Sequence, residues 1–457
     1  MASGALTQLV AIGAQDANFL SEDEKYSVFQ SKDPKINNFV KSTSSMQPKG
    51  SVNWGSKIRF VVEREGDLLN TAYLVIKLPK IARDFLTTKT NNYYVRWVDY
   101  IGNALVKNIK LFIGGQLIDE QTGDFMQIFN DLYDDDFNKL CLIGMDGNLN
   151  TPAEEIDSTW VYIPLKFWFC NNLSDALPLI ALQHHSVEIE VEFREWSECY
   201  QVLDKKENNQ GFVHSQKTNP MVKQDLEGCR LDCNYIYLDS KERIRISQKS
   251  HKFLITQTQK IEAAVGSGKS VELNFNHPVK EMFYYFSNNY VKSQPDPLNF
   301  SLKTEYQTPE YFDKFMNGIP NKTVADYNSL RKDHILGEAR ILINGFPRVE
   351  WKDYKYYYFL QNYENYRNKL EHNVYLYSFS SNPTAGVPMG SLNFSRVDNS
   401  QLQFTINDIT KKNVKRDLLN NNQLKNISDE NLNVTIYGVN YNYLEIEGGM
   451  AGLKYCN

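Results

Sequence analysis

The chain has 457 residues, of which 42% are hydrophobic and 23% are charged, a composition typical of globular proteins and a length sufficient for two or three domains. The formal net charge is −5 at pH 7, and this slight acidic excess argues against a broad nucleic-acid-binding surface, which needs an excess of basic residues. Aromatic residues make up 13% of the chain and favour strands over helices.

The N-terminal stretch is mildly apolar. It has no basic residue ahead of its apolar run and no long hydrophobic segment, so it is a weak candidate for a signal peptide. We interpret residues 1–24 as an extended arm that docks on another surface, with a frayed tail as the alternative. No apolar run elsewhere approaches the roughly 20 residues that cross a bilayer as a helix.

Alternation of apolar and polar residues recurs along the chain and predicts half-buried strands in antiparallel sheets. In chain order, the alternating apolar positions are Ile58, Phe60, Val62; Leu74, Ile76, Leu78; Val187, Ile189, Val191, Phe193; Val271, Leu273, Phe275; and Leu402, Phe404, Ile406. Strands and helices do not alternate regularly, which disfavours a parallel doubly wound fold. The fold class is therefore all-β.

A polar, weakly patterned stretch at 204–228 predicts a linker between two halves of similar size, 25–203 and 229–457. Two further polar stretches, near 295–333 and 411–431, are rich in Asn and Lys and predict long surface loops.

The two halves repeat each other weakly. Residues 111–116 (LFIGGQ) align with residues 341–346 (ILINGF) at an offset of 230, and each segment reads as a strand followed by a Gly-Gly or Asn-Gly hairpin turn. An apolar stripe at helical spacing follows each turn at an offset of 231: Phe125, Ile128, Phe129, Leu132, and then Tyr356, Phe359, Leu360, Tyr363.

A third match supports this alignment. Phe169 and Pro178 correspond to Phe379 and Pro388 at an offset of 210. Chance similarity between two β-rich halves is the alternative, but three blocks in one order favour an internal duplication of one β-sandwich. The period is too long for a solenoid or a propeller blade.

Three glutamates, Glu188, Glu190 and Glu192, are the most suggestive candidates for catalysis. The segment resembles the E-x-D-x-E signature of β-sandwich glycosidases, with Glu190 in place of the Asp. Alternate strand residues project from one face about 6.6–6.8 Å apart, which would suit a nucleophile and an acid/base. Burial of the intervening apolar residues already explains the alternation, so we favour a solvated strand face.

Other constellations predict no chemistry. Residues 266–270 (GSGKS) resemble the end of a phosphate-binding loop, but Ala263 stands where that motif needs Gly, so we predict a hairpin loop. The adjacent His184 and His185 would point to opposite faces of a strand and cannot share a metal. The acidic run 134–136 lacks the spacing of a calcium loop and predicts a solvated turn. We expect no catalytic residue, no cofactor and no metal.

The six cysteines are sparse, and only Cys229 and Cys233 lie close together in sequence. A C-x3-C pair without a second pair or a nearby His is a poor zinc site, so we predict free thiols.

Six Asn-x-Ser/Thr sequons occur along the chain, at Asn172, Asn299, Asn321, Asn393, Asn426 and Asn433. Asn299 and Asn321 lie in loop-like stretches and are the predicted acceptors, should the chain meet a glycosyltransferase. Asn393 and Asn433 lie next to strand patterns and are predicted to be structural.

Several longer stretches resemble the major capsid proteins of the nucleocytoplasmic large DNA viruses, a group that includes phycodnaviruses, iridoviruses, marseilleviruses and mimiviruses. The matching segments are 64–69 (REGDLL), 97–105 (WVDYIGNAL), 163–169 (IPLKFWF), 176–178 (ALP), 193–196 (FREW), 274–281 (NFNHPVKE), 374–379 (VYLYSF), 390–398 (GSLNFSRVD) and 448–455 (GGMAGLKY). They run nearly from end to end of the chain.

The resemblance implies a double jelly roll, in which two eight-stranded sandwiches stand side by side with a few short helices and long surface loops. It implies a structural protein of the virion: homotrimeric, pseudo-hexagonal capsomers, assembled in the host cytoplasm, that contact neighbouring capsomers, minor capsid proteins and penton proteins. The loops would face outward and carry glycans. The arm at 1–24 would face an internal membrane, and the genome would not be contacted.

Two alternative functions also fit the sequence. One is a β-sandwich glycosidase that uses Glu188 and Glu192, and the other is a monomeric sugar-binding jelly roll.

Overall fold

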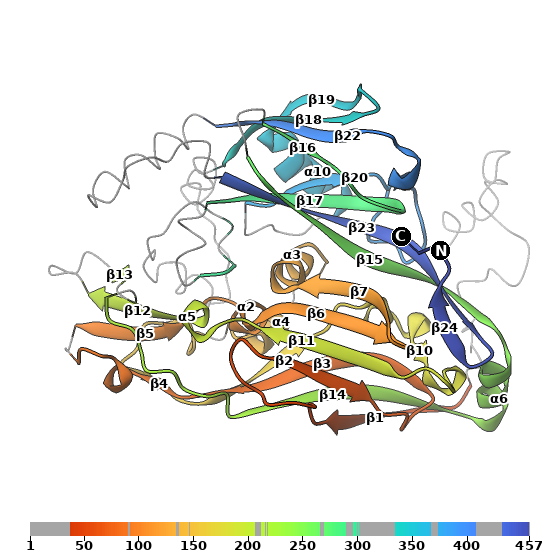
Figure 1. Ribbon diagram of the computed structural model, residues 1–457, viewed down its shortest axis with the longest axis horizontal. Coiled ribbons are helices and arrows are strands. Elements are labelled where there is room, and N and C mark those ends of the chain that lie inside the picture. Colours follow the sequence, from red (N-terminus) through yellow and green to blue (C-terminus); the bar gives the residue numbers. More distant parts are fainter. Residues whose placement is uncertain are drawn as a thin grey trace, which may run out of the picture. The chain divides into compact units, whose positions relative to one another are not determined.

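The computed structural model describes a subset of the chain: residues 37–89, 92–133, 137–145, 147–205, 212–214, 216, 218–265, 269–288, 296–298, 300, 334–366, 373–407 and 432–456. The chain divides into two compact units, Met1–Phe39 and Val40–Asn457. The predicted arm at 1–24, the acidic run 134–136 and most of the predicted loops at 295–333 and 411–431 lie outside the described residues. The described part of the larger unit forms two antiparallel β-sandwiches (Figure 1).

The first sandwich consists of two sheets. One has the order β1 (Phe39–Met46), β14 (Gly228–Leu238), β3 (Leu68–Leu78), β10 (Leu177–Pro178), with β9 (Thr159–Pro164) also on β3. The other has the order β2 (Lys57–Val62), β11 (Val187–Phe193), β6 (Val106–Ile113), β7 (Gln116–Thr122). Short sheets add β5 (Tyr93–Trp97), β12 (Tyr200–Lys205), β13 (Phe212–His214), β4 (Ile81–Ala82) and β8 (Glu155–Ile156).

The second sandwich repeats this plan. One sheet has the order β15 (His251–Ala264), β23 (Leu432–Glu447), β17 (Pro278–Asn288), β20 (Tyr375–Ser378), with β21 (Leu392–Asn393) on β17 and β24 (Met450–Leu453) on β23. The other has the order β16 (Ser270–Glu272), β22 (Ser400–Ile406), β18 (Leu336–Ile343), β19 (Phe346–Asp353).

Helices occupy the connections between strands. In the described part of the chain, the α-helices are α2 (Ile101–Leu105), α3 (Gly123–Tyr133), α4 (Phe137–Leu142), α5 (Trp196–Cys199), α6 (Ser240–Gln248) and α10 (Gln361–Asn365). A π-helix, η7 (Tyr356–Leu360), precedes α10, and single 3-10 turns are η3 (Arg83–Phe85), η4 (Trp168–Cys170), η5 (Leu173–Asp175), η6 (Leu179–Ala181) and η8 (Phe394–Arg396). Both predicted segments are therefore helical, the second as a π-helix that continues into α10. Phe125, Ile128 and Leu132 of the first stripe are buried, as expected for a stripe that packs on a sheet. The second stripe is not: Phe359, Leu360 and Tyr363 are exposed, and the buried residues of the π-helix are Tyr357 and Tyr358.

The predicted hairpins are confirmed by their backbone. Gly114 and Gly115 between β6 and β7 have φ of 58° and 80°, and Asn344 and Gly345 between β18 and β19 have φ of 50° and 82°. Positive φ at both central residues is the geometry of a two-residue hairpin turn, and Gly and Asn adopt it most readily.

The pairing of the strands adds evidence for the duplication that the sequence alignment lacks. In the β6–β7 pair, Ile118 is a bulged residue without a partner, and Arg348 is the bulged residue at the same place in β18–β19. Asn70 of β3 and Lys280 of β17 are likewise bulged against β14 and β23. Because bulges are specific features of a strand pair, their recurrence aligns the two sandwiches around these positions.

The predicted linker at 204–228 does not separate the two sandwiches, because β13 within it pairs with β12 and the next strand still belongs to the first sandwich. Strand β14 begins at Gly228 and pairs with β3 as far as Ile236, so it closes the first sandwich as β23 closes the second. The polar composition of residues 204–228 indicates a loop before β14. It does not indicate to which domain β14 belongs, because that depends on the strand with which β14 pairs. The connection between the sandwiches is α6.

The burial of side chains confirms the alternating pattern predicted from the sequence. All the alternating apolar residues predicted to face inward, from Ile58 to Ile406, are buried. A cluster of three indoles anchors one end of the first sandwich, with ring centroids 5.1 Å apart for Trp54 and Trp196, 5.8 Å for Trp97 and Trp196 and 6.0 Å for Trp54 and Trp97. Such offset and edge contacts add to the stabilisation from burial of the rings.

Candidate functional site

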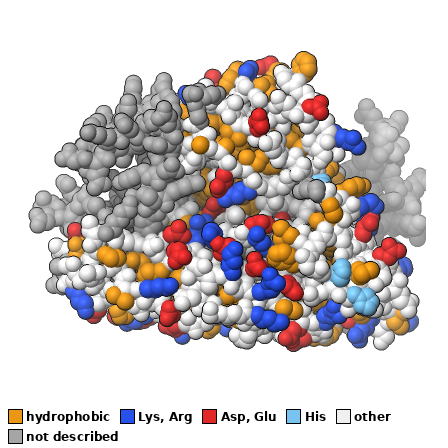
Figure 2. Space-filling model, in the orientation of Figure 1, with side chains coloured by type: hydrophobic (Ala, Val, Ile, Leu, Met, Phe, Trp, Pro, Cys, Tyr) orange, Lys and Arg blue, Asp and Glu red, His pale blue; other side chains and the backbone are white. Residues whose placement is uncertain are grey.

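The three glutamates lie on a solvated strand face, as favoured from the sequence. On β11, Val187, Ile189, Val191 and Phe193 are buried while Glu188, Glu190 and Glu192 point outward. Glu188 and Glu190 bind the Arg59 guanidinium at 3.1 and 2.9 Å. Acidic and basic side chains are interspersed across this part of the surface (Figure 2).

Glu192 is not suited to general acid catalysis. Its carboxylate lies 2.6 Å from Lys107 Nζ and 3.0 Å from Lys57 Nζ, and the hydrogen bond from Lys107 is the main cause of a lowered pKa. A glycosidase acid needs a raised pKa so that it holds a proton near neutrality. The environment of Glu192 shifts the pKa the opposite way.

The other residues considered for binding or catalysis do not form a site in the described part of the chain. Residues 266–268 of the GSGKS segment lie outside the described residues, and Ser270 begins strand β16. The predicted hairpin is wrong, because β15 pairs with β23 and β16 pairs with β22 in the other sheet. Among the residues that the structure describes, no group of three or more His, Cys, Asp or Glu side chains is placed to hold a metal ion. All six cysteines are free thiols, as predicted.

No helix in the described part of the chain is long and apolar enough to cross a membrane.

Of the sequons, Asn299 and Asn321 lie outside the described residues. Asn393 has a structural role, since its side chain accepts a hydrogen bond from the Ser395 N–H at 3.1 Å and caps η8. Asn433 lies within β23 and pairs with both β15 and β17.

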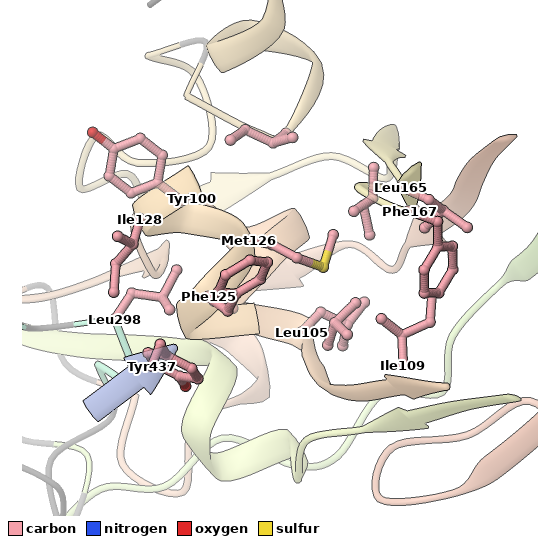
Figure 3. Close-up of a cluster of buried hydrophobic side chains, with 14 of the residues drawn as sticks. Tyr100, Leu105, Ile109, Phe125, Met126, Ile128, Leu165, Phe167, Leu298 and Tyr437 are labelled. Atoms are coloured by element: carbon pink, nitrogen blue, oxygen red, sulfur yellow. The ribbon is translucent and has the colours of Figure 1, made fainter. Parts of the chain in front are cut away.

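The richest cluster of buried polar and aromatic groups lies at the seam, which we define as the contact of α3 and β7 with β15, β17 and β23. Figure 1 shows α3 between β7 and these three strands. Phe125 of α3 packs on Phe283 of β17, with ring centroids 6.0 Å apart. It also packs on Tyr437 of β23, at 5.7 Å (Figure 3). The Tyr437 and Thr122 hydroxyls are hydrogen-bonded at 2.6 Å.

Gly123, the first residue of α3, allows this helix to pack closely on the backbone of α2 and β6. A Cβ on Gly123 would lie 2.1 Å from the Asn103 carbonyl oxygen and 2.4 Å from that of Val106, so no larger residue fits. This close approach brings the start of α3 against α2 and directs the apolar stripe of α3 toward the second sandwich.

Glu281 is the centre of the buried polar network at the seam. Its side chain is fully buried and accepts hydrogen bonds from the hydroxyls of Tyr133, at 2.5 Å, and Tyr366. Lys280 Nζ lies 3.1 Å from the Glu281 carboxylate and donates to the Pro383 carbonyl oxygen at 3.0 Å. Burial and the nearby Glu281 charge raise the pKa of Tyr133 well above its usual value, so this hydroxyl remains a donor.

Asp124 makes a second buried connection. Its carboxylate accepts from Arg194 Nη2 at 2.8 Å within the first sandwich and from the Tyr285 hydroxyl at 3.1 Å across the seam. Each carboxylate oxygen thus has one partner, and the two partners come from different sandwiches.

Asp119 on β7 makes a third connection. One carboxylate oxygen accepts from the Thr258 backbone N–H and the other from Gln121 Nε2, both at 2.8 Å. Burial raises the pKa of Asp119 to about 7. The neighbouring carbonyl of Ile118, the bulged residue, accepts from Gln257 Nε2 of β15.

The C-terminal hairpin, β23 with β24, contacts the first sandwich at the loop before β11 and at the start of β7. The Gly449 carbonyl accepts from the His184 N–H at 2.9 Å, and the Ala451 N–H donates to His185 Nδ1 at 3.1 Å. Gln116 Oε1 accepts from the Leu453 N–H at 3.3 Å. The two adjacent histidines therefore serve as docking points for residues 448–455.

The REGDLL segment contacts the loop before β11 and the connection that leads to the second sandwich. Arg64 donates to the carbonyl oxygens of Gln183 and His185, and Asp67 accepts from the Leu238 N–H at 2.9 Å. Asp67 also pairs with Arg243 of α6 at 3.1 Å. This motif thus holds both the loop that carries the histidines and the connection between the sandwiches.

Sequence reasoning missed the buried carboxylates of the seam. A signal for Glu281 was present, because this charged residue interrupts the otherwise apolar strand PVKEMFYYF. Asp119 and Asp124 carried no such signal.

Two sandwiches of one plan, joined through a buried seam in a single chain, define a double jelly-roll protein. Two family models match: "Major capsid protein N-terminus" over residues 27–239 and "Large eukaryotic DNA virus major capsid protein" over residues 242–452. The chain therefore belongs to the family of major capsid proteins of large eukaryotic DNA viruses, which are structural proteins of the virion capsid and not enzymes.

Individual relatives agree. The major capsid protein of Paramecium bursaria Chlorella virus 1 is 28% identical, with 100% of both chains covered, and that of Pyramimonas orientalis virus is 29% identical over 99% of this chain and 100% of the relative. A quasi-atomic model of the PBCV-1 virus capsid has a TM-score of 0.70 at 26% identity, covering 94% of this chain and 100% of that chain. The Faustovirus major capsid protein shares the fold, with a TM-score of 0.69, at 13% identity over 98% of this chain and 99% of that chain.

Proposed function

We propose that three copies of this chain form a pseudo-hexagonal capsomer that tiles the flat facets of an icosahedral shell. The observation that carries this proposal is the duplication: the same strand order occurs twice in one chain, with corresponding bulges at Ile118 and Arg348 and at Asn70 and Lys280. Three chains then supply six sandwiches of one plan, and hexagonal units tile a plane with one gene product. Contacts between neighbouring capsomers, each weak, are multiplied over a facet.

The seam supports this role, because a tile must hold its two sandwiches in one arrangement. Buried carboxylates bonded from both sides, such as Asp124 and Glu281, tolerate little displacement, since an unpaired buried charge is costly.

The test is the absolute mass in solution, measured by light scattering after size exclusion over a dilution series. We expect one species at three times 53.0 kDa that persists on dilution. A folded monomer at every concentration would contradict the capsomer.

The finer roles follow from the same proposal. Residues 1–24 face the inside of the shell, toward minor capsid proteins and an internal membrane, and penton proteins fill the vertices. Assembly takes place in the host cytoplasm. Deletion of residues 1–24 is expected to leave the trimer intact and to abolish co-assembly with the inner partners; loss of the trimer would contradict this.

Asn299 and Asn321 are the proposed glycan acceptors, on loops that face outward. Intact-mass measurement of protein from virions is expected to show added glycan mass that the double variant Asn299→Gln, Asn321→Gln lacks. If the double variant carried the same added glycan mass as the wild type, the glycans would be attached at other residues.

A further inference from the structure

The hairpin–helix unit that forms one side of the seam occurs a second time. We call β7 with α3 the first docking face, and β19 with η7 and α10 the second docking face. They occupy equivalent positions, because β7 and β19 share the bulge at Ile118 and Arg348 and each is followed by an apolar helical stripe. The first docking face is buried against β15, β17 and β23 of the same chain.

The second docking face has no such cover within the described residues. Strand β19 forms the edge of its sheet, away from α3 (Figure 1), and only Val349 of its eight residues is buried. Phe346 is 77% exposed and Tyr363 is 76% exposed. Three further large apolar side chains are exposed on the same elements: Trp351, Phe359 and Leu360. Clustered apolar exposure of this kind marks an interaction surface.

The register identifies the surface that would receive it. In the seam, the first docking face packs on outward residues of β17 and β23, including Phe283 and Tyr437. Alignment of the bulged residues Asn70 and Lys280 places Tyr73 at the position of Phe283, and their cross-strand partners place Asp232 at the position of Tyr437.

This receiving surface, the outward face of β1, β14 and β3 with Trp160 of the neighbouring β9, carries aromatic and polar side chains. Tyr73 and Asp232 are half-buried, and Arg230 binds Asp232 at 3.0 Å and lies 4.7 Å from the centroid of the Trp160 ring. Tyr, Trp and Arg are enriched in protein–protein interfaces. Thr43 and Ser45 of β1 donate to Asn234 and Asp232 on the same face, both at 2.6 Å.

We propose that the second docking face of one copy packs on the receiving surface of another copy, in the manner in which the first docking face packs within the chain. The proposal rests on the proposed function and specifies the surfaces through which copies join. The contact is heterologous, with different surfaces on the two copies, and such contacts form rings when the rotation closes. In a ring of three chains, six seams of one kind alternate within and between copies.

Phe346→Glu and Tyr363→Glu test the docking side. Both side chains are largely exposed, so the substitutions leave the fold of each copy intact, as circular dichroism and an unchanged melting temperature of the isolated chain would verify. A charge in the centre of an interface is expected to raise the concentration of half-dissociation about tenfold or more. Val222→Glu is the matched control, since Val222 is 63% exposed and lies on neither surface.

The receiving side is tested by hydroxyl-radical footprinting of Tyr73. Its oxidation rate is expected to be severalfold lower in the wild-type oligomer than in the Phe346→Glu variant, and unchanged by Val222→Glu. A wild-type monomer at all concentrations would overturn the proposed function and this assignment together. A wild-type trimer that both docking-face variants leave intact, or whose Tyr73 is as reactive as in a monomer, would overturn this assignment alone.

Discussion

The carboxylate of Asp119 on β7 accepts a hydrogen bond from the backbone N–H of Thr258 on β15, at 2.8 Å. One residue of the first sandwich is thereby tied to the main chain of the second, in a place from which water is excluded. Burial raises the pKa of Asp119 to about 7, so the carboxyl group holds its proton at mildly acidic pH. The seam therefore contains a group that titrates near neutrality.

The first prediction is that Asp119→Asn flattens the pH dependence of stability. The unfolded pKa of an Asp is about 3.9. Between about pH 4 and pH 7 the folded chain holds a proton that the unfolded chain has lost, so this stabilisation is complete below about pH 4 and is lost as the pH rises toward 7. The slope is up to about 1.4 kcal/mol per pH unit.

Urea unfolding of the wild type and of Asp119→Asn at pH 5, 6 and 7, at one protein concentration, measures this difference. Glu120→Gln is the control, because the neighbouring Glu120 pairs with Lys110 on the open sheet face. Parallel pH profiles for the wild type and Asp119→Asn would show that Asp119 does not titrate in this range.

Glu281→Ala is predicted to destabilise the protein by about 3–5 kcal/mol, since it leaves the buried Lys280 cation and two tyrosine hydroxyls without their acceptor. Glu445→Ala removes a surface pair with Lys454 and is expected to change stability by less than about 1 kcal/mol. Chemical denaturation compares the two, and equal effects would contradict a central role for Glu281.

Gly123→Ala is predicted to prevent α3 from seating on α2. The added Cβ would meet backbone carbonyl oxygens at 2.1 and 2.4 Å, and backbone atoms cannot move aside as a flexible side chain can. We expect a large loss of soluble yield and a lower melting temperature. Gly386→Ala is the control, since its Cβ would meet only the Asn172 side chain at 3.8 Å. A normal melting temperature for Gly123→Ala would mean that α2 and α3 can separate without cost.

The double variant Glu188→Gln, Glu192→Gln is predicted to fold with stability within about 1 kcal/mol of the wild type, because exposed ion pairs contribute little. The same measurement at high salt is expected to reduce the difference further. Glycoside hydrolysis by the wild type that is lost in this variant would revive the glycosidase alternative, whereas no hydrolysis by either protein is the expected result.

Gln116→Ala is predicted to loosen the C-terminal hairpin, because the Leu453 N–H then loses its acceptor on the first sandwich. Hydrogen exchange of the peptide that contains residues 450–454 is expected to accelerate severalfold while that of β17 stays unchanged. Equal acceleration in both segments would indicate global destabilisation instead.

Local rules in the sequence determined most of the strand and turn assignments. The alternation at Val187–Phe193 predicts a half-buried strand because side chains of a strand point to opposite faces, and the Gly114–Gly115 and Asn344–Gly345 turns follow from the positive φ that these residues permit. The duplication was visible for the same reason, since each repeat of the plan needs the same local signals.

Only the tertiary structure decided where the first sandwich ends and which polar residues are buried. Strand β14 pairs with β3, although about 160 residues separate them in sequence, as the Asn234–Thr71 hydrogen bond illustrates, and composition near residue 228 carries no record of that partner. Asp119 and Glu281 are buried because the other sandwich packs over them. Their environments arise from contacts between segments distant in sequence, whereas periodicity and turn chemistry depend on neighbours in the chain.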